Sequence, residues 1–131
     1  MQDAFHYFRR FLAKFWLEIN LQLTVVGVTG SYGKTSAVNA IAAVLKEKYY
    51  VNQTDLNLDT VYNLPITILK TKLWNEVLVL EYGVDHIGEM DKHLSLVKPK
   101  IAVLTGVTPV HADKEHLGSL ENIIKEKKKL V

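Results

Sequence analysis

The stretch "VTGSYGKTS", residues 28–36, decides how this chain should fold. An apolar run precedes it and an alanine-rich segment follows it, so a buried strand, a glycine turn and a helix should succeed one another. The general phosphate-binding loop reads G-x-x-x-x-G-K-[ST], and Val28 stands where its first glycine should be. What remains is a shorter G-x-x-G-K-T motif, formed by Gly30, Gly33, Lys34 and Thr35.

A loop of this kind binds phosphate through backbone N–H groups at the start of a helix. Lys34 would add a mobile positive charge, and the Thr35 hydroxyl would be a ligand for magnesium. The alternative is a plain glycine turn with a solvated lysine, but the position between a strand and a helix favours a nucleotide site. The predicted nucleotide-binding residues are Thr29, Gly30, Ser31, Tyr32, Gly33, Lys34, Thr35 and Ser36.

Three short runs are almost continuously apolar, which is typical of parallel strands covered on both faces. They are "LTVVGV" (23–28), "VLVLEYG" (77–83) and "IAVLTG" (101–106), and "YYVNQT" (49–54) is a weaker strand candidate. Helical patterns separate them, at residues 35–48, from Pro65 onward with the proline in the first turn, and at 88–97. We therefore predict an α/β fold with a mostly parallel sheet, whose ligands bind at the carboxyl ends of the strands.

The first twenty residues contain an aromatic and basic segment, "QDAFHYFRRFLAKFWLEIN". Three basic residues interrupt it and no small-residue cleavage site follows, so it matches neither a targeting segment nor a membrane span. We expect an amphipathic helix packed on its own domain. A helix that lies on a membrane surface, or that contacts a partner or a neighbouring domain, is the alternative. Its inward stripe would be Phe5, Phe8, Leu12, Phe15, Trp16 and Ile19.

Composition limits the classes of protein that this chain can be. Its 131 residues suffice for one domain, and 48% hydrophobic with 23% charged residues is ordinary for a globular protein. The formal charge of +2 is too small to indicate nucleic-acid binding. The absence of cysteine excludes a disulfide framework and fits a reducing compartment, so we expect a cytoplasmic protein.

Two further residues at strand ends are candidate metal ligands. Glu81 follows four apolar residues, and a carboxylate there is costly to bury without a partner, so magnesium ligation is favoured over a first exposed loop residue. His111 lies in the loop after the last predicted strand, where a neutral imidazole could bind a metal; alone, it would more simply be a solvated histidine.

The chain ends in a lysine-rich helix with Ser119 as its predicted N-cap. Lys127 falls within the predicted inward stripe, so it needs a partner, snorkels to solvent or is chemically altered. Because it lies near the end of the chain, we expect a frayed turn and an ordinary, exposed ammonium there. The inward stripe is predicted to be Leu120, Ile123, Ile124 and Val131, with Lys125, Lys128 and Lys129 solvated.

The order of these motifs resembles the central, ATP-binding domain of the Mur ligases. The resemblance covers roughly residues 22–131, and the shortened phosphate loop is the normal form in that family. Within it, the branch that adds D-alanyl-D-alanine to UDP-N-acetylmuramoyl-tripeptide is the most similar. The E-x-G-x-x-H-x-G-[DE] motif of that branch appears here as Glu81, Gly83, His86, Gly88 and Glu89.

The resemblance implies an ATP-dependent, amide-forming ligase that works through an acyl phosphate in peptidoglycan precursor synthesis. Lys34 would bind the ATP phosphates, Thr35 and Glu81 a first Mg2+, and His111 a second. Lys127 would be carried as a carbamate, an anionic metal ligand. Lys34, His111 and Lys127 are thus the catalytic candidates, with UDP-MurNAc-peptide and D-Ala-D-Ala as substrates of the complete enzyme.

The chain departs from the family pattern in two motifs. Asn63 occupies a glycine position, which would be tolerable in left-handed backbone. Gly106 and Thr108 alter the turn of T-N-x-G-P-x-H around an intact Pro109.

The resemblance also sets the expected domain organisation. We expect residues 1–20 to be an additional amphipathic helix and 21–131 the N-terminal part of an incomplete central domain, without activity when isolated. A folylpolyglutamate synthase segment and a non-catalytic nucleotide-binding or partner module are the alternative functions.

Overall fold

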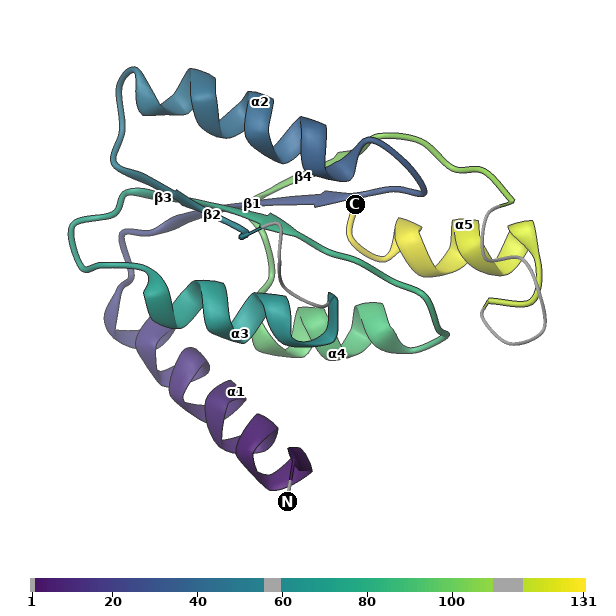
Figure 1. Cartoon of the computed structure of the whole chain (residues 1–131), viewed down its shortest axis with the longest axis horizontal. Helices are drawn as coiled ribbons and strands as arrows, with labels where there is room; N and C mark the ends of the chain where they lie inside the picture. The colour runs from purple at the N-terminus through teal and green to yellow at the C-terminus, as the bar shows by residue number, and fades with distance from the viewer. Residues whose placement is uncertain (1, 56–59, 110–116) are drawn as a thin grey trace.

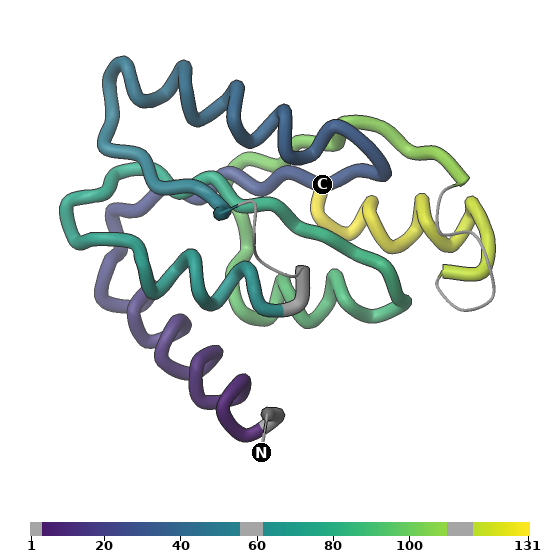
Figure 2. The backbone as a smooth tube through the Cα atoms, in the orientation of Figure 1, coloured from purple at the N-terminus to yellow at the C-terminus, as the bar shows by residue number. Residues whose placement is uncertain are grey.

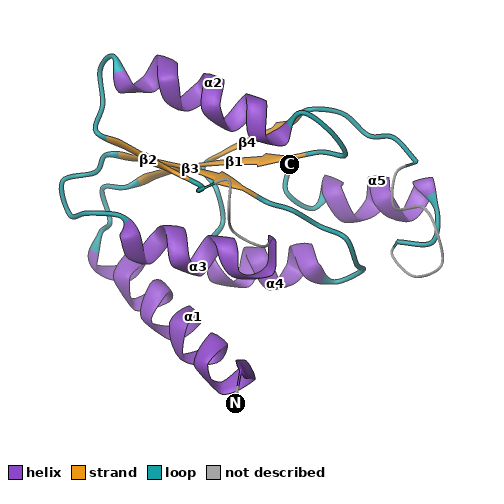
Figure 3. Ribbon diagram, viewed as in Figure 1, coloured by secondary structure: helices purple, strands orange, loops and turns teal. Residues whose placement is uncertain are grey.

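The computed structural model describes residues 2–55, 60–109 and 117–131 (Figure 1). Five helices and four strands alternate along this part of the chain (Figure 3). In order they are α1 (Gln2–Ile19), β1 (Thr24–Thr29), α2 (Lys34–Lys46), β2 (Val51–Gln53), α3 (Thr60–Lys70), β3 (Val77–Glu81), α4 (Glu89–Leu96), β4 (Ile101–Leu104) and α5 (Leu120–Lys128). None of the helices described is both long and apolar enough to cross a bilayer.

The four strands form one parallel sheet in the order β2-β3-β1-β4. β1 is central, pairing Val26 with Val79 of β3 and with Ile101 of β4. The predicted α/β fold with a parallel sheet is confirmed, including the weaker strand candidate, which is β2. Because all strands run the same way, their carboxyl ends lie at one edge of the sheet, where the first turn of α2 also lies (Figure 1).

Side chains alternate between the two faces of the sheet and form two cores. On one face α2 covers valines of β1 and β3, with Val38 and Ala42 fully buried. On the other face α3 and α4 pack on the sheet, and Tyr82 is buried with Leu78 and Leu80. Helices therefore lie on both faces of the sheet (Figure 3). The edge strand β4 is not covered on both faces as predicted, because Ile101 and Leu104 are exposed.

Helix α1 packs on α3 and α4 through a different face from the one predicted. Ala13 is fully buried, Trp16 and Leu17 are half-buried beside it, and Arg10 donates to the Lys92 carbonyl oxygen at 2.7 Å. Of the predicted inward stripe, Trp16 does pack against the core, but most of the other aromatic rings lie on other sides of the helix. Phe5, Phe8, Phe15 and Ile19 are each more than half exposed.

Helix α3 begins earlier than predicted. It starts at Thr60, so Pro65 lies inside it and not in its first turn. The missing proline N–H costs one helical hydrogen bond, but Leu64 and Ile68 are fully buried on the sheet and hold the helix in place. Asn63 is also helical, so the left-handed backbone considered for it is not observed.

Helix α5 begins at the predicted N-cap, where the Ser119 hydroxyl accepts the Asn122 N–H at 3.1 Å. Of the predicted inward stripe only Ile123 is buried, whereas Leu120, Ile124 and Val131 are exposed. The buried positions are instead Ile123, Glu126, Lys127 and Leu130. The expectation of an exposed Lys127 in a frayed turn is therefore wrong: the side chain is 3% exposed, because α5 packs beside α4 (Figure 2) and Lys127 reaches the loop after β1.

Candidate functional site

The loop between β1 and α2 is built on two glycines that another residue would disrupt. An ideal Cβ on Gly30 would lie 2.0 Å from the Thr105 hydroxyl oxygen, so only glycine allows this close approach. Gly33 is the N-cap of α2 in left-handed backbone, with φ 71°. The two glycines turn the chain sharply from the strand into the helix.

This turn has the features of an anion site. The first N–H groups of α2 lack partners within the helix, and the helix dipole adds partial positive charge at that end. The first turn of α2 contains no acidic residue but does contain Lys34, which is half-buried. Ser31 is also half-buried, whereas Tyr32, Thr35 and Ser36 are exposed to solvent, so a ligand can reach the turn.

The structure brings the two predicted magnesium ligands together. Thr35 Oγ1 donates to Glu81 Oε2 at 2.8 Å, joining the first turn of α2 to the end of β3. The Glu81 side chain lies on the α2 face of the sheet, because Val77 and Val79 of the same strand belong to the core beneath α2.

Two residues that were not predicted as site residues hold Glu81 in place. The Thr54 hydroxyl accepts the Glu81 N–H at 2.9 Å, and Asn63 Nδ2 donates to the Glu81 carbonyl oxygen at 3.1 Å. Both side chains are almost completely buried. In the sequence, Asn63 stands out only as a departure from the family pattern, and nothing in the local sequence marks Thr54.

The hydroxyl and carboxylate oxygens fit Mg2+, which uses few protein ligands and takes water and phosphate oxygens for the rest. Within the described ranges there is no cluster of three or more histidine, cysteine, aspartate or glutamate residues that could hold a metal alone. The predicted second ligand, His111, lies outside the described residues.

Lys127 reaches the same loop from α5. Its Nζ donates to the Gly30 carbonyl oxygen at 3.1 Å. Burial lowers the pKa of the Lys127 amine, and the nearby Lys34 charge lowers it further, while Asp85 and Glu126 oppose the shift. The structure thus places Lys34, Thr35, Glu81 and Lys127 around one loop.

The residue before Lys127 anchors α5. Glu126 is 2% exposed, and its Oε1 accepts the N–H groups of Gly88 and Met90 at 2.9 and 3.0 Å, at the start of α4. Its Oε2 accepts a hydrogen bond from Lys129 Nζ at 2.7 Å. Lys129 therefore has ionic partners and is not simply solvated as predicted. These contacts explain why α5 stays ordered.

The segment after β4 is hydrogen-bonded to the phosphate loop. The Ser31 N–H donates to the Gly106 carbonyl oxygen at 2.8 Å, and the Thr108 N–H donates to Ser31 Oγ at 3.1 Å. The Thr105 hydroxyl donates to the Tyr32 carbonyl oxygen. The altered turn noted in the sequence is therefore part of the site.

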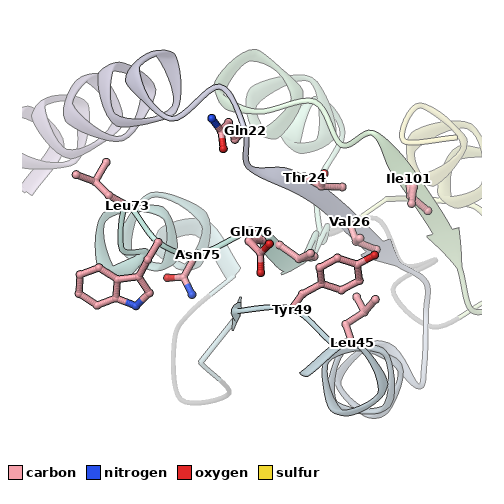
Figure 4. A pocket seen from close by; sticks show the side chains of 11 residues that line it. Gln22, Thr24, Val26, Leu45, Tyr49, Leu73, Asn75, Glu76 and Ile101 are labelled. Carbon is pink, nitrogen blue, oxygen red and sulfur yellow. The ribbon is translucent and has the colours of Figure 1, made fainter. Parts of the chain in front are cut away.

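A cavity of about 490 Å³ lies elsewhere, at the amino ends of the strands (Figure 4). Thr24, Val77 and Ile101 are the first residues of their strands and line it, together with Tyr49 and Trp74. Because the phosphate loop follows the carboxyl end of β1, this cavity is not part of the site.

Comparisons with known proteins agree with this geometry. Residues 28–131 match the family described as Mur ligase middle domain. The UDP-N-acetylmuramoyl-tripeptide--D-alanyl-D-alanine ligase of Bacillus subtilis (strain 168) is 38% identical over 120 residues, covering 92% of this chain and 26% of that protein. The ligase of the same name from Borreliella burgdorferi is 32% identical over 120 residues, covering 92% and 25%.

Solved structures give the same result. The crystal structure of MurF ligase from Thermotoga maritima in complex with ADP matches with a TM-score of 0.86 and 34% identity, over 96% of this chain and 29% of that one. Crystal structure I of MurF from Acinetobacter baumannii matches with a TM-score of 0.85 and 25% identity, over 95% and 27%. The chain spans about a quarter of the length of the curated relatives it matches.

Proposed function

This chain belongs to the Mur ligase family, and we propose on that premise that it is the ATP-binding segment of a ligase that joins D-alanyl-D-alanine to UDP-N-acetylmuramoyl-tripeptide. The observation that carries the proposal is the hydrogen bond between Thr35 and Glu81. It lies at the start of α2, whose first turn contains no acidic residue. It supports a site for a nucleotide and its magnesium ion. The proposed reaction belongs to peptidoglycan precursor synthesis, and we propose a cytoplasmic location for it.

The proposed reaction has two steps. A carboxylate oxygen of the UDP-linked substrate attacks the γ-phosphorus of ATP, which gives an acyl phosphate and ADP. The amine of D-alanyl-D-alanine then attacks the acyl carbon, and the tetrahedral intermediate loses phosphate to leave an amide. Positioning and charge stabilisation would be the main contributions of the protein to the first step.

The phosphate loop is proposed to bind the nucleotide phosphates through residues 30–36 of the predicted set 29–36. Thr29 is left out because it is fully buried and its hydroxyl donates to the Tyr82 carbonyl oxygen at 2.9 Å. Free N–H groups at the start of α2 would donate to phosphate oxygens, and Lys34 would add a charge-assisted hydrogen bond. These groups are fixed before the ligand arrives, because Gly33 caps the helix and Gly30 is held by Lys127.

Magnesium would be held by Thr35 and Glu81. When bound, the ion would offset negative charge that builds up on the transferred phosphoryl group. We further propose His111 and a carbamate of Lys127 as ligands of a second ion. The buried, pKa-lowered amine supports the carbamate, because only an uncharged amine reacts with carbon dioxide.

The test is isothermal titration calorimetry of the whole chain with Mg-ADP. Lys34→Ala should weaken binding by about tenfold or more, because a hydrogen bond to a charged group is lost. Lys46→Ala, at the far end of the same helix, is the matched control and should bind like the wild type. Equal affinity in the wild type and Lys34→Ala would refute the phosphate-binding role.

A further inference from the structure

Within the proposed nucleotide site, Tyr32 makes a contact that phosphate binding alone does not explain. Tyr32 is 57% exposed at the middle of the loop, yet its ring lies on the backbone of Gly106 after β4. An ideal Cβ on Gly106 would lie 2.4 Å from the Tyr32 hydroxyl oxygen and 2.6 Å from Cζ. The tyrosine therefore occupies the space that a side chain at position 106 would need.

The contact is specific to this pair. The three atoms nearest to that Cβ position all belong to Tyr32. The backbone of Gly106 is outside the left-handed region, unlike that of Gly30 and Gly33, so alanine could adopt its conformation. The tyrosine ring is thus the main obstacle to a side chain at position 106.

Two hydrogen bonds join the same two segments, one donated by a side chain and one between backbone groups. The Tyr32 carbonyl oxygen accepts the Thr105 hydroxyl, and the neighbouring Ser31 N–H donates to the Gly106 carbonyl oxygen at 2.8 Å. The ring and these two bonds therefore fasten the first half of the loop to the segment after β4. The second half of the loop, from Gly33, leads into α2 and keeps its N–H groups for a ligand.

We propose that Tyr32 is a positioning residue: its ring, seated on Gly106, fixes the phosphate loop in the conformation that binds nucleotide. The inference rests on the proposed nucleotide-binding function and deepens it. Tyr32 and Gly106 are then a matched pair, because in this conformation the ring and a side chain at position 106 would occupy the same space. Substitutions at the two positions should not act independently, because residues in contact couple energetically.

A double-mutant cycle with Mg-ADP titrations tests the pairing. Gly106→Ala displaces the ring and should weaken binding about tenfold, and Tyr32→Ala should weaken it by about threefold or more. Tyr32→Phe keeps the ring and should lose less affinity than Tyr32→Ala. The double variant should bind like Tyr32→Ala alone, because the added methyl group then has space. The proposal would be overturned if the double variant lost Mg-ADP affinity by the product of the two single-variant losses. It would also be overturned if Tyr32→Ala bound Mg-ADP as tightly as the wild type.

A measurement without ligand separates this proposal from the proposed function. The Ser31 amide should exchange its hydrogen faster in Tyr32→Ala than in the wild type, while the Val26 amide of β1 should not change. Tyr50→Ala, an exposed tyrosine far from the loop, is the control and should leave Ser31 exchange unaltered. If the wild type binds no Mg-ADP, nucleotide binding is refuted, and Ser31 exchange alone decides whether the loop is held by Tyr32.

Discussion

Gly30 is the point at which the phosphate loop meets two other parts of the fold. Its carbonyl oxygen accepts the buried Lys127 amine, and its Cα lies against Thr105. A residue with a side chain would push the loop away from β4, and loss of the lysine would leave a carbonyl group without that donor. The glycine is therefore required by its surroundings as well as by the turn.

The Thr35 hydroxyl should determine how strongly nucleotide binding depends on magnesium. Thr35→Val keeps the shape of the side chain but removes the oxygen that contacts Glu81, so the gain in ADP affinity from added magnesium should shrink about tenfold. Thr35→Ser retains the oxygen and is the matched control. Titrations of both variants with and without magnesium measure the difference; an unchanged magnesium effect in Thr35→Val would argue against ligation by this residue.

His93 should make stability depend on pH. It is 5% exposed, and its Nε2 lies 2.8 Å from the Gly83 carbonyl oxygen, so Nε2 carries the proton of the neutral ring. Burial lowers its pKa below the ordinary 6.5, although the bond to Gly83 opposes the shift. As the pH falls below 6.5, His93 takes up a proton in the unfolded chain before it does so in the folded chain. The free energy of unfolding should therefore fall as pH falls.

Urea unfolding of the wild type and His93→Gln across this range measures the effect. The glutamine does not titrate, so the wild type should lose stability relative to it as the solution is acidified below pH 6.5. Parallel curves for the two proteins would show that His93 is not responsible.

Among the elements, α1 is hydrogen-bonded to α4 through the side chain of Arg10. Arg10 donates to the Lys92 carbonyl oxygen and to Ser95 Oγ, at 2.7 and 3.1 Å, near the carboxyl end of α4. Arg10→Ala should reduce the free energy of unfolding by about 1 kcal/mol. Lys14→Ala, on an exposed position of the same helix, should change it by less than about 0.5 kcal/mol. Equal losses would mean that the contact is not specific.

The strands could be predicted from the sequence because a continuous apolar run has no polar face. It predicts a strand without any decision about which of its side chains point inward. Helices leave that choice open: periodicity indicated a stripe on α1, but the fully buried Ala13 lies outside that stripe. In α5 the predicted stripe was right for Ile123 and Lys127, which are buried, and wrong for Leu120 and Ile124, which are exposed. The buried side also includes Glu126, so it holds two charged residues, Glu126 and Lys127. Their partners, at the start of α4 and in the phosphate loop, come from distant parts of the sequence.

The candidate site, like the helices, could be predicted only in part. The residues that follow from local sequence were predictable, and those that support them from other elements were not. Lys34, Thr35 and Glu81 follow strands or begin a helix, so local pattern and parallel topology bring them together. Thr54 and Asn63 support the backbone of Glu81 from other elements, and only the packed structure reveals them. His111 stays a prediction.

At the scale of the whole molecule, the site is open. Tyr32, Thr35 and Ser36 are exposed, so water has access to the phosphate loop. An acyl phosphate is hydrolysed by water, and enzymes that form such intermediates exclude it. The chain also spans only about a quarter of the length of its curated relatives. Nucleotide binding and complete ligation therefore place different demands on these 131 residues.

We predict that this chain, prepared by itself, binds Mg-ADP but forms no amide. It offers the phosphate loop and the Thr35–Glu81 pair, whereas covering the nucleotide and two further substrates takes surface beyond that loop. The measurement is product formation, followed by mass spectrometry, with ATP, magnesium, UDP-N-acetylmuramoyl-tripeptide and D-alanyl-D-alanine. The full-length Bacillus subtilis ligase is the positive control. Product from the 131-residue chain at a rate comparable to that control would contradict the prediction and show that the open site suffices.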